Sequence, residues 1–235
     1  MPLPSVFAHE WLSPHRLAVY TQQTVGDLNA ALELYDWNSA VTAACLRDIG
    51  HFEVLIRNRY AERLNNHYTD WTTTSSALWS RETGIPSTRQ KQHAANERSK
   101  QAIAQARRDA PSTTQGHVIA QLTFGFWANL TLPYRESTIW TPILSPVLPG
   151  HPRGPHHDRM NKLNKFRNRL AHWEPVFSNT TGLPTRLAEF DDLFRSVDAD
   201  VATWVGTRSA LIDVLDSCPV PHLQPTVLTY LGNTP

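Results

Sequence analysis

Apolar residues recur every three or four positions along most of this chain, which is the period of an amphipathic helix. The longest run covers residues 38–64, where Asn38 or Ser39 can cap the first turn. A shorter helix is predicted just before it, over residues 25–35. No alternation with a period of two is long enough to predict a β-sheet. The pattern therefore predicts an all-α protein.

Further helices are predicted over residues 87–109, 114–130, 158–174 and 185–215. The 87–109 segment has strong helix formers but few large apolar residues, so we expect it to be solvated along most of its length. The 114–130 segment is apolar on most sides and is expected to be buried. Residues 67–86, rich in Thr and Ser, and the Pro-rich residues 141–157 are predicted to be loops.

The length of 235 residues fits one large domain, with a core over about residues 20–217 and irregular termini. The net charge of +1 gives no overall attraction to a polyanion, but the charges are unevenly distributed. Residues 81–109 carry seven Arg or Lys against three acids, and residues 151–169 carry six against one. Residues 186–216 reverse the sign. The basic segments could form one patch for a phosphate backbone, or they could be ordinary solvated faces.

The N-terminal segment lacks the basic start and apolar run of a signal peptide, and no apolar stretch approaches the roughly 20 residues that span a bilayer. Cys45 and Cys218 match no metal or redox spacing and are expected to be reduced thiols, which predicts a cytoplasmic protein with no membrane partner. No Gly-rich phosphate loop, Gly-x-Ser-x-Gly or His-Glu-x-x-His motif occurs. P-loop NTPases, serine hydrolases of that type and zinc proteases therefore have no support.

The predicted helix over 158–174 combines an apolar stripe with a polar motif near its end. It is expected to stop before Pro175, because the residue before a proline avoids helical geometry. The stripe consists of Met160, Leu163, Phe166 and Leu170.

The polar motif lies in KFRNRLAHWEP, residues 165–175, where Asn168 and His172 are four residues apart and share a helix face. Arg167 is about 140° around the axis from His172, but its long side chain can reach that face. Histidine moves protons at neutral pH, and a bidentate Arg stabilises extra negative charge on phosphorus. These groups suit the cleavage of RNA. By spacing alone, a basic helix end with a hydrogen-bonded histidine is the plainer interpretation.

The wider string RNRLAHWEPVF resembles the Arg-Asn-Arg-Ile-Ala-His-His-Glu-Pro-Ile signature of the Abi-like (abortive infection) family, a branch of the HEPN superfamily. Other blocks of the chain look like that family's blocks in the same order, which is more specific than one motif. They are LYDWNSA (34–40), FEVLIRNRYAERL (52–64), HVIAQLTFGFWANL (117–130) and IWTPIL (139–144).

The resemblance implies an all-α HEPN bundle that pairs as a homodimer and joins two motifs into one cleft. It implies metal-independent endoribonuclease chemistry without a cofactor, in which the ribose 2′-hydroxyl attacks and leaves a cyclic phosphate. The implied role is a toxin that arrests the host cell during phage infection, with an antitoxin as a possible partner. Arg167 and His172 fall on the catalytic pair, and Asn168 falls on the polar position beside the Arg.

This sequence departs from the family signature at Trp173, where many relatives have a second histidine. Trp173 could stack on an unpaired base, or it could be a buried wedge at the helix end. Its presence leaves open a non-catalytic HEPN module that binds RNA, a nucleotide or a partner protein. A scaffold that sequesters a host protein is a third possibility.

The remaining site residues are assigned around this motif. RNA contacts are predicted for Arg159, Lys162, Lys165, Arg169 and Trp173. Glu53 and Arg57 have the spacing of an intrahelical ion pair, and in the resembling blocks they align with a Glu and an Arg that could support the motif helix. A cluster of histidines in the Pro-rich segment could meet phosphates or bind a metal, but no acid or Cys is near at ligand spacing, so no metal is assigned. The cluster comprises His151, His156 and His157.

Overall fold

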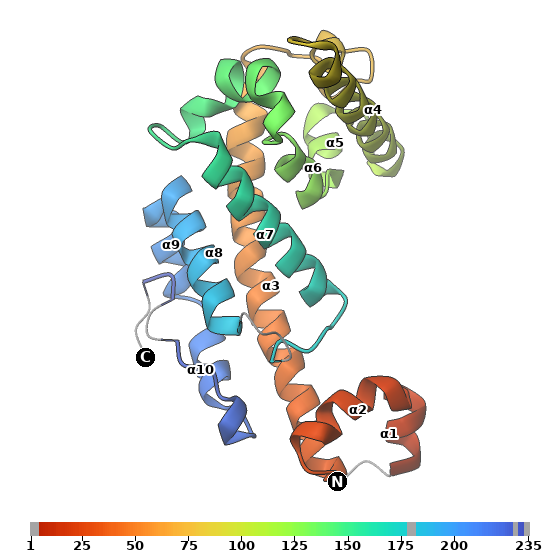
Figure 1. The fold of residues 1–235 in the computed structure, drawn as a ribbon, viewed down its shortest axis with the longest axis vertical. Helices are drawn as coiled ribbons and strands as arrows, with labels where there is room; N and C mark the ends of the chain where they lie inside the picture. The colour runs from red at the N-terminus through yellow and green to blue at the C-terminus, as the bar shows by residue number, and fades with distance from the viewer. Residues whose placement is uncertain (1–4, 178–181, 228–229, 233–235) are drawn as a thin grey trace. The chain divides into compact units, whose positions relative to one another are not determined.

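The computed structural model describes residues 5–177, 182–227 and 230–232, and within these ranges it contains helices and no β-strand. The predicted all-α class is confirmed (Figure 1). None of the helices in the described ranges combines the length and the apolarity needed to cross a membrane.

The longest element is α3 (Leu28–Asn65), which runs without a break through the two segments predicted as separate helices. The predicted cap at Asn38 is wrong, because Asn38 lies inside the helix and is fully buried. One stripe of buried side chains passes straight through this point at spacings of three and four, so nothing interrupts the helix. The stripe includes Ala31, Leu34, Trp37, Val41, Cys45, Ile49, Phe52, Ile56, Tyr60 and Leu64.

The chain forms two compact units, one of Met1–Gly50 with Phe166–Pro235 and one of His51–Lys165. The first unit contains the first part of α3 and the end of α7 (Arg153–Ala171). Its other helices are α1 (Ser5–Leu12), α2 (Pro14–Gln23), α8 (Leu183–Val197), α9 (Ala199–Gly206), α10 (Leu211–Asp216) and η5 (Pro221–Leu223).

The two N-terminal helices of the first unit pack beside the start of α3, as Figure 1 shows. The edge of the Trp11 ring meets Tyr35 at 5.4 Å between centroids, and Tyr20 meets Tyr35 at 5.3 Å. Tyr20 also meets Phe177 at 5.5 Å. This chain of rings joins α1, α2 and α3 to the segment that follows α7. Neither N-terminal helix was predicted from the hydrophobic pattern.

The predicted helix over 185–215 is divided into α8, α9 and α10. Asp198 interrupts it with an extended backbone, φ −163°, and its carboxylate accepts a hydrogen bond from the Val201 N–H at 3.0 Å. Aspartate competes with the helical backbone in this way and so favours a cap. After α9, the Ser209 hydroxyl donates to the buried Asp48 carboxylate at 2.6 Å, which ties the turn before α10 to α3.

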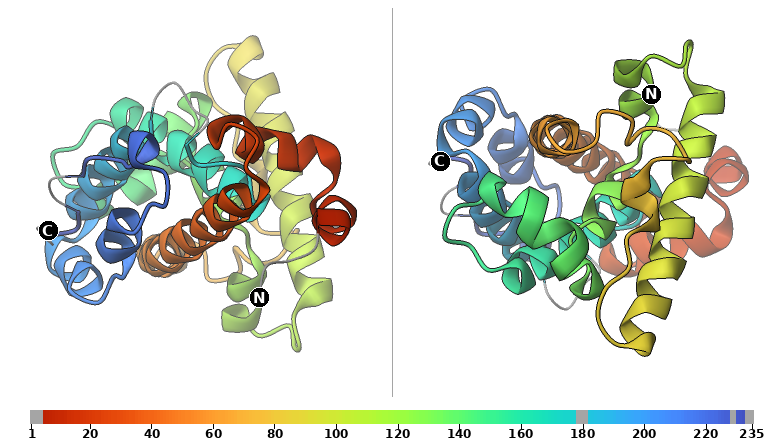
Figure 2. Two further views of the ribbon diagram at one scale, coloured as in Figure 1. Left: turned by 90° about the horizontal axis from the view of Figure 1, so that it is seen from below. Right: turned by 90° about the horizontal axis from the view of Figure 1, so that it is seen from above.

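The second unit contains the rest of α3 and the first part of α7. Its other elements are η1 (Ala77–Ser80), α4 (Pro86–Asp109), α5 (Gln115–Gln121), α6 (Phe124–Asn129), η2 (Pro133–Arg135), the wider π-type turn η3 (Glu136–Leu144) and η4 (Ser145–Val147). Helix α4 lies beside α5 and α6 (Figures 1 and 2).

In the second unit, helix α4 confirms the predicted helix over 87–109. The single helix predicted over 114–130 is instead two helices, α5 and α6, separated by an extended break at Leu122 and Thr123. The apolar residues after the break are still buried as expected. Trp127 meets Phe126 at 5.1 Å and Trp71 at 5.9 Å between ring centroids.

The predicted Pro-rich loop over 141–157 is mostly helical. Residues up to Val147 belong to η3 and η4, and α7 begins at Arg153. Pro155 stands in the first turn of α7, where a missing N–H has no intrahelical partner to lose. Proline content alone therefore predicted a loop where the chain begins its motif helix.

Candidate functional site

The motif lies at the C-terminal end of α7, which its apolar stripe fixes in place. All four stripe residues are buried, as predicted, with exposures from 0% to 8%. They are Met160, Leu163, Phe166 and Leu170. Because this stripe occupies one side of the helix, the polar motif residues are left on the other sides.

Asn168 and His172 share an exposed face of α7, as their spacing predicted. The His172 N–H still donates to the Asn168 carbonyl oxygen at 3.0 Å, so helical geometry extends to His172. Lys165 is exposed as well, three residues before Asn168. Arg167 is partly exposed at the side of this face. An imidazole, an amide and two cations thus lie along one end of one helix.

The end of α7 is a Schellman motif with an unusual residue at its left-handed position. The Trp173 N–H donates to the Leu170 carbonyl at 2.9 Å, and the Glu174 N–H donates to the Arg169 carbonyl at 3.1 Å. Trp173 has φ +57°, where glycine is the usual residue. A side chain there costs on the order of 1 kcal/mol. Helix α7 therefore stops by this motif, two residues before the predicted break at Pro175.

Trp173 is not the buried wedge that was one of its two interpretations. Its side chain is 42% exposed, and it directly follows His172. Packing in the core explains most buried aromatic side chains. It does not explain a large, partly exposed aromatic side chain on a strained backbone. The observation keeps base stacking as the remaining interpretation of Trp173.

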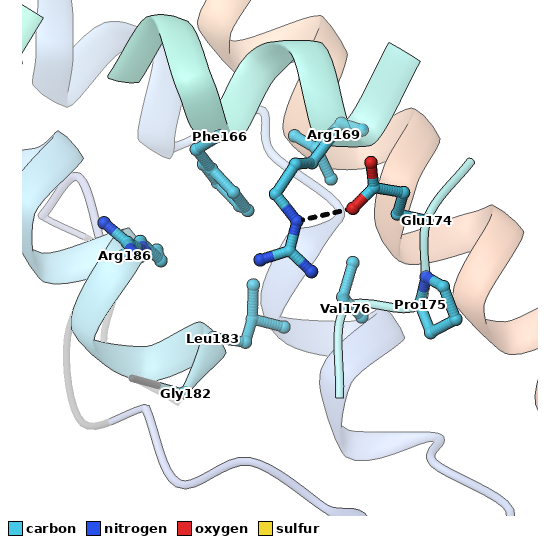
Figure 3. Close-up of a pocket in the computed structure, with 9 residues that line it drawn as sticks. Phe166, Arg169, Glu174, Pro175, Val176, Gly182, Leu183 and Arg186 are labelled. Carbon is cyan, nitrogen blue, oxygen red and sulfur yellow. Dashed lines mark hydrogen bonds and ion pairs between the residues drawn. The ribbon is translucent and has the colours of Figure 1, made fainter. Parts of the chain in front are cut away.

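Arg169, one of the predicted RNA contacts, is held by Glu174. Its Nε donates to the Glu174 carboxylate at 2.8 Å, and Figure 3 shows its guanidinium beside Phe166, Leu183 and Val176. The cavity among these residues is about 10 Å³, room for roughly one water molecule. Arg169 can contact RNA only by leaving or sharing Glu174, so its predicted role is untested.

Two residues at this helix end were missed from the sequence. The Val176 N–H donates to the buried Asn38 side-chain oxygen at 2.8 Å, which anchors the segment after the motif to α3. The Arg16 guanidinium donates to the His172 carbonyl at 3.4 Å and adds an exposed cation. Asn38 carried a signal, an amide inside an apolar stripe, but that signal was interpreted as a cap. Arg16 carried none.

No family model, no curated protein and no solved structure matches this chain. Evidence about the function of this protein therefore comes from the motif residues and their geometry. Within the described part of the chain, no three or more His, Cys, Asp or Glu side chains are grouped so that they could hold a metal ion.

The histidine cluster has structural partners. His156 is buried and its Nε2 is 2.7 Å from the Tyr60 hydroxyl, while the His157 Nδ1 is 2.9 Å from the Thr131 hydroxyl. Burial lowers the pKa of His156 to about 3, with smaller contributions from nearby positive charges. His156 is thus buried and neutral at physiological pH, whereas His151 is exposed and His157 is partly exposed. Phosphate contacts of the cluster stay a prediction.

The other predicted residues belong to the second unit. Lys162 is exposed, and Arg159 and Glu53 are partly exposed. The Arg57 Nε is buried without a hydrogen-bond partner among the described residues, and Arg57 borders a polar cavity of about 460 Å³ with Asn58. The RNA contacts of the first two and the supporting role of Glu53 and Arg57 are still predictions.

Proposed function

We propose that this protein is a metal-independent endoribonuclease of the HEPN type, with Arg167 and His172 as catalytic residues and Asn168 assisting them. The observation that carries the proposal is the exposed face shared by Asn168 and His172 at the end of α7, with Arg167 beside it. The order of the resembling sequence blocks supports it independently of the geometry.

The reaction is a transfer within the RNA strand. The ribose 2′-oxygen forms a bond to phosphorus, the bond from phosphorus to the 5′-oxygen breaks, and a 2′,3′-cyclic phosphate and a 5′-hydroxyl result. One group must accept the 2′-hydroxyl proton and another must give a proton to the leaving 5′-oxygen. Arg167 stabilises the charge on phosphorus with paired N–H donors, and the Asn168 amide adds a donor.

The single histidine of the motif favours a paired site. Trp173 replaces the second histidine of the family signature, so each chain offers His172 alone within this motif. Two copies would supply one histidine as acid and one as base. Exposed aromatic side chains in the same unit as the motif give a second copy apolar surface to cover, with Phe7 58% and Trp11 63% exposed. We therefore propose a homodimer with a composite active site.

The proposed biological role comes from the resemblance to the Abi-like family. An RNase of this type acts as a growth-arresting toxin in abortive infection, in the cytoplasm, and an antitoxin could cover the same surface. Lys165 and Lys162 on α7 supply exposed positive charge for the RNA backbone. Trp173 supplies an aromatic face for an unpaired base.

The test is cleavage of total RNA by the purified protein in EDTA, comparing wild type with His172→Ala. His67→Ala is the matched control, because His67 is an exposed histidine of the second unit. We expect wild type and His67→Ala to produce 2′,3′-cyclic phosphate ends and His172→Ala to produce none.

Three other outcomes contradict the proposal. Equal cleavage by wild type and His172→Ala means that a contaminant or another residue is responsible. RNA binding without cleavage by any of the three favours the non-catalytic module, and no RNA affinity favours a scaffold for a host protein.

A further inference from the structure

The second unit contains a buried arginine whose charge is not compensated. Arg135, at the end of η2, is 1% exposed. One guanidinium nitrogen donates to the Ser99 hydroxyl at 2.8 Å, but Nε and the other terminal nitrogen are buried without a hydrogen-bond partner among the described residues. The guanidinium carbon lies 5.8 Å from the centre of the Trp79 ring. Two donors of this group therefore have no acceptor among the described residues.

The carboxylate next to Arg135 in sequence and those on α4, the helix that packs against η2, already have partners. Glu136 accepts from Arg153, Glu97 from Lys100 at 2.8 Å, and Asp109 from the Gln105 side chain at 2.8 Å. No ion pair joins Arg135 to an acid within the described ranges. An unpaired charge away from water is costly, so the position favours an anion from outside the chain.

A cavity of about 200 Å³ adjoins Arg135. Its wall combines polar side chains with apolar ones, and the Arg98 side chain adds a second positive charge to it. The polar members include Ser99, Thr123 and Asn129, and the apolar ones include Phe126 and Leu132.

The charge of Arg135 persists at neutral pH. Burial lowers the pKa of Arg135 to about 10, and the positive charge of Arg98 contributes in the same direction. A group with this pKa is still protonated at pH 7. Two neighbouring cations, one of them buried, therefore belong to the lining of a cavity that contains no carboxylate.

We propose that this cavity is a binding site for a phosphate group, held by Arg135 and Arg98 with the Ser99 hydroxyl. Arginine suits this task because its planar fork pairs with two oxygens of one phosphate. The phosphate group can be free inorganic phosphate or the terminal group of a mononucleotide. The site lies in the His51–Lys165 unit, and it is independent of the proposed ribonuclease motif, which lies in the other unit.

The test is thermal unfolding of the full chain, with sodium phosphate added to a phosphate-free buffer and sodium chloride at matched ionic strength as the reference. At a phosphate concentration about 100 times the Kd, we expect the Tm of the wild type to rise by about 5 to 10 °C. Arg135→Met should lose this rise, and Arg89→Gln should retain it because Arg89 is an exposed cation on the same helix as Arg98.

A second variant protects the test if Arg135→Met does not fold. Arg98 is exposed, so Arg98→Gln should fold and bind phosphate about tenfold more weakly in a calorimetric titration. Titration with adenosine 5′-monophosphate separates the two sources: tighter binding than phosphate assigns the site to a nucleotide, and equal or weaker binding assigns it to the free ion. A chloride effect equal to that of phosphate, or an undiminished rise in Arg135→Met, overturns the proposal.

Discussion

Polar groups have opposite surroundings at two places in this protein. At the end of α7, Asn168, His172 and Trp173 are exposed to solvent. In the second unit, Arg135 and His156 are 1% and 4% exposed, and burial lowers the pKa of both. The exposed end resembles a family signature, whereas neither buried group belongs to that signature.

The difference shows what each place needs in order to act. Burial has already changed the acid–base behaviour of Arg135 and His156, and the fold alone accounts for that change. The exposed end of α7 lies in water, where charges interact weakly. A catalytic site there obtains dry surroundings only when RNA or a second copy of the chain covers it. The proposed composite dimer is thus one way to supply these surroundings, and bound RNA is the other.

The largest expected effect separates the two arginines. Arg167→Gln removes the charge and the paired donors at the proposed scissile phosphate, so cleavage should fall about a thousandfold, roughly 4 kcal/mol in the barrier. Arg167→Lys should also fall, because an ammonium lacks the fork. Arg135→Met should cleave at the wild-type rate. The measurement is the initial rate of cleavage of a labelled RNA at saturating concentration.

Arg89→Gln is the matched control for the change of charge, since Arg89 is exposed in the second unit. If Arg167→Gln retains more than a tenth of the wild-type rate, Arg167 is not catalytic. If Arg135→Met loses activity while it remains folded, the two places are not independent.

The next largest effect is the change of stability with pH that the buried His156 causes. Burial is the main reason that the pKa of His156 is lowered to about 3, and the charges of Arg159, His151 and His157 add to it. The unfolded chain binds this proton near pH 6.5, but the folded chain does not. The contribution of the neutral imidazole to stability is therefore complete above pH 6.5, and it is lost as the pH falls toward 3. By pH 4 the loss is about 3 kcal/mol.

His156→Gln isolates this contribution, because a glutamine amide can form a hydrogen bond with the Tyr60 hydroxyl in either direction but does not titrate. Urea unfolding between pH 7.5 and pH 4 should show a shallower loss of stability in the variant than in the wild type. An equal loss of stability in the two proteins would mean that the folded and unfolded chains bind the His156 proton at the same pH.

The sequence predicted the elements that depend on periodicity. The buried stripe of α7 and the sharing of a face by Asn168 and His172 follow from side-chain spacing, which a single sequence records. Helix α4 follows from its content of strong helix formers. Periodicity predicted wrong helix bounds where a polar side chain has a partner that the pattern does not record. The Asp198 side chain caps a new helix, and the Asn38 side chain lies inside α3, where it accepts from the distant Val176 N–H.

The buried groups could not be predicted for a related reason. Burial of Arg135 depends on where η2 packs against α4, and no local pattern states which surface a short turn will meet. The left-handed backbone at Trp173 was also unpredictable, because propensity places glycine or asparagine there. Such departures from local preference are expected where function or tertiary packing overrides them.

The smallest expected effect concerns that backbone. Trp173→Gly and Trp173→Ala both remove the ring, so the loss of its partial burial is common to the two variants. They differ in the cost of φ +57°, which glycine avoids and alanine does not. Trp173→Gly should therefore be more stable than Trp173→Ala by about 1 kcal/mol, although alanine is the better residue inside a helix. Urea unfolding of the pair measures this difference.

The RNA affinity of the same two variants tests whether Trp173 stacks on a base at the exposed end of α7. If Trp173 stacks on a base, both variants should bind single-stranded RNA about tenfold more weakly than the wild type, and equally so, because stacking depends on the ring and not on the backbone. Unchanged binding in both would overturn base stacking as the role of Trp173. Weaker binding in Trp173→Ala alone would mean that the ring is dispensable and that the conformation of the helix end positions the RNA.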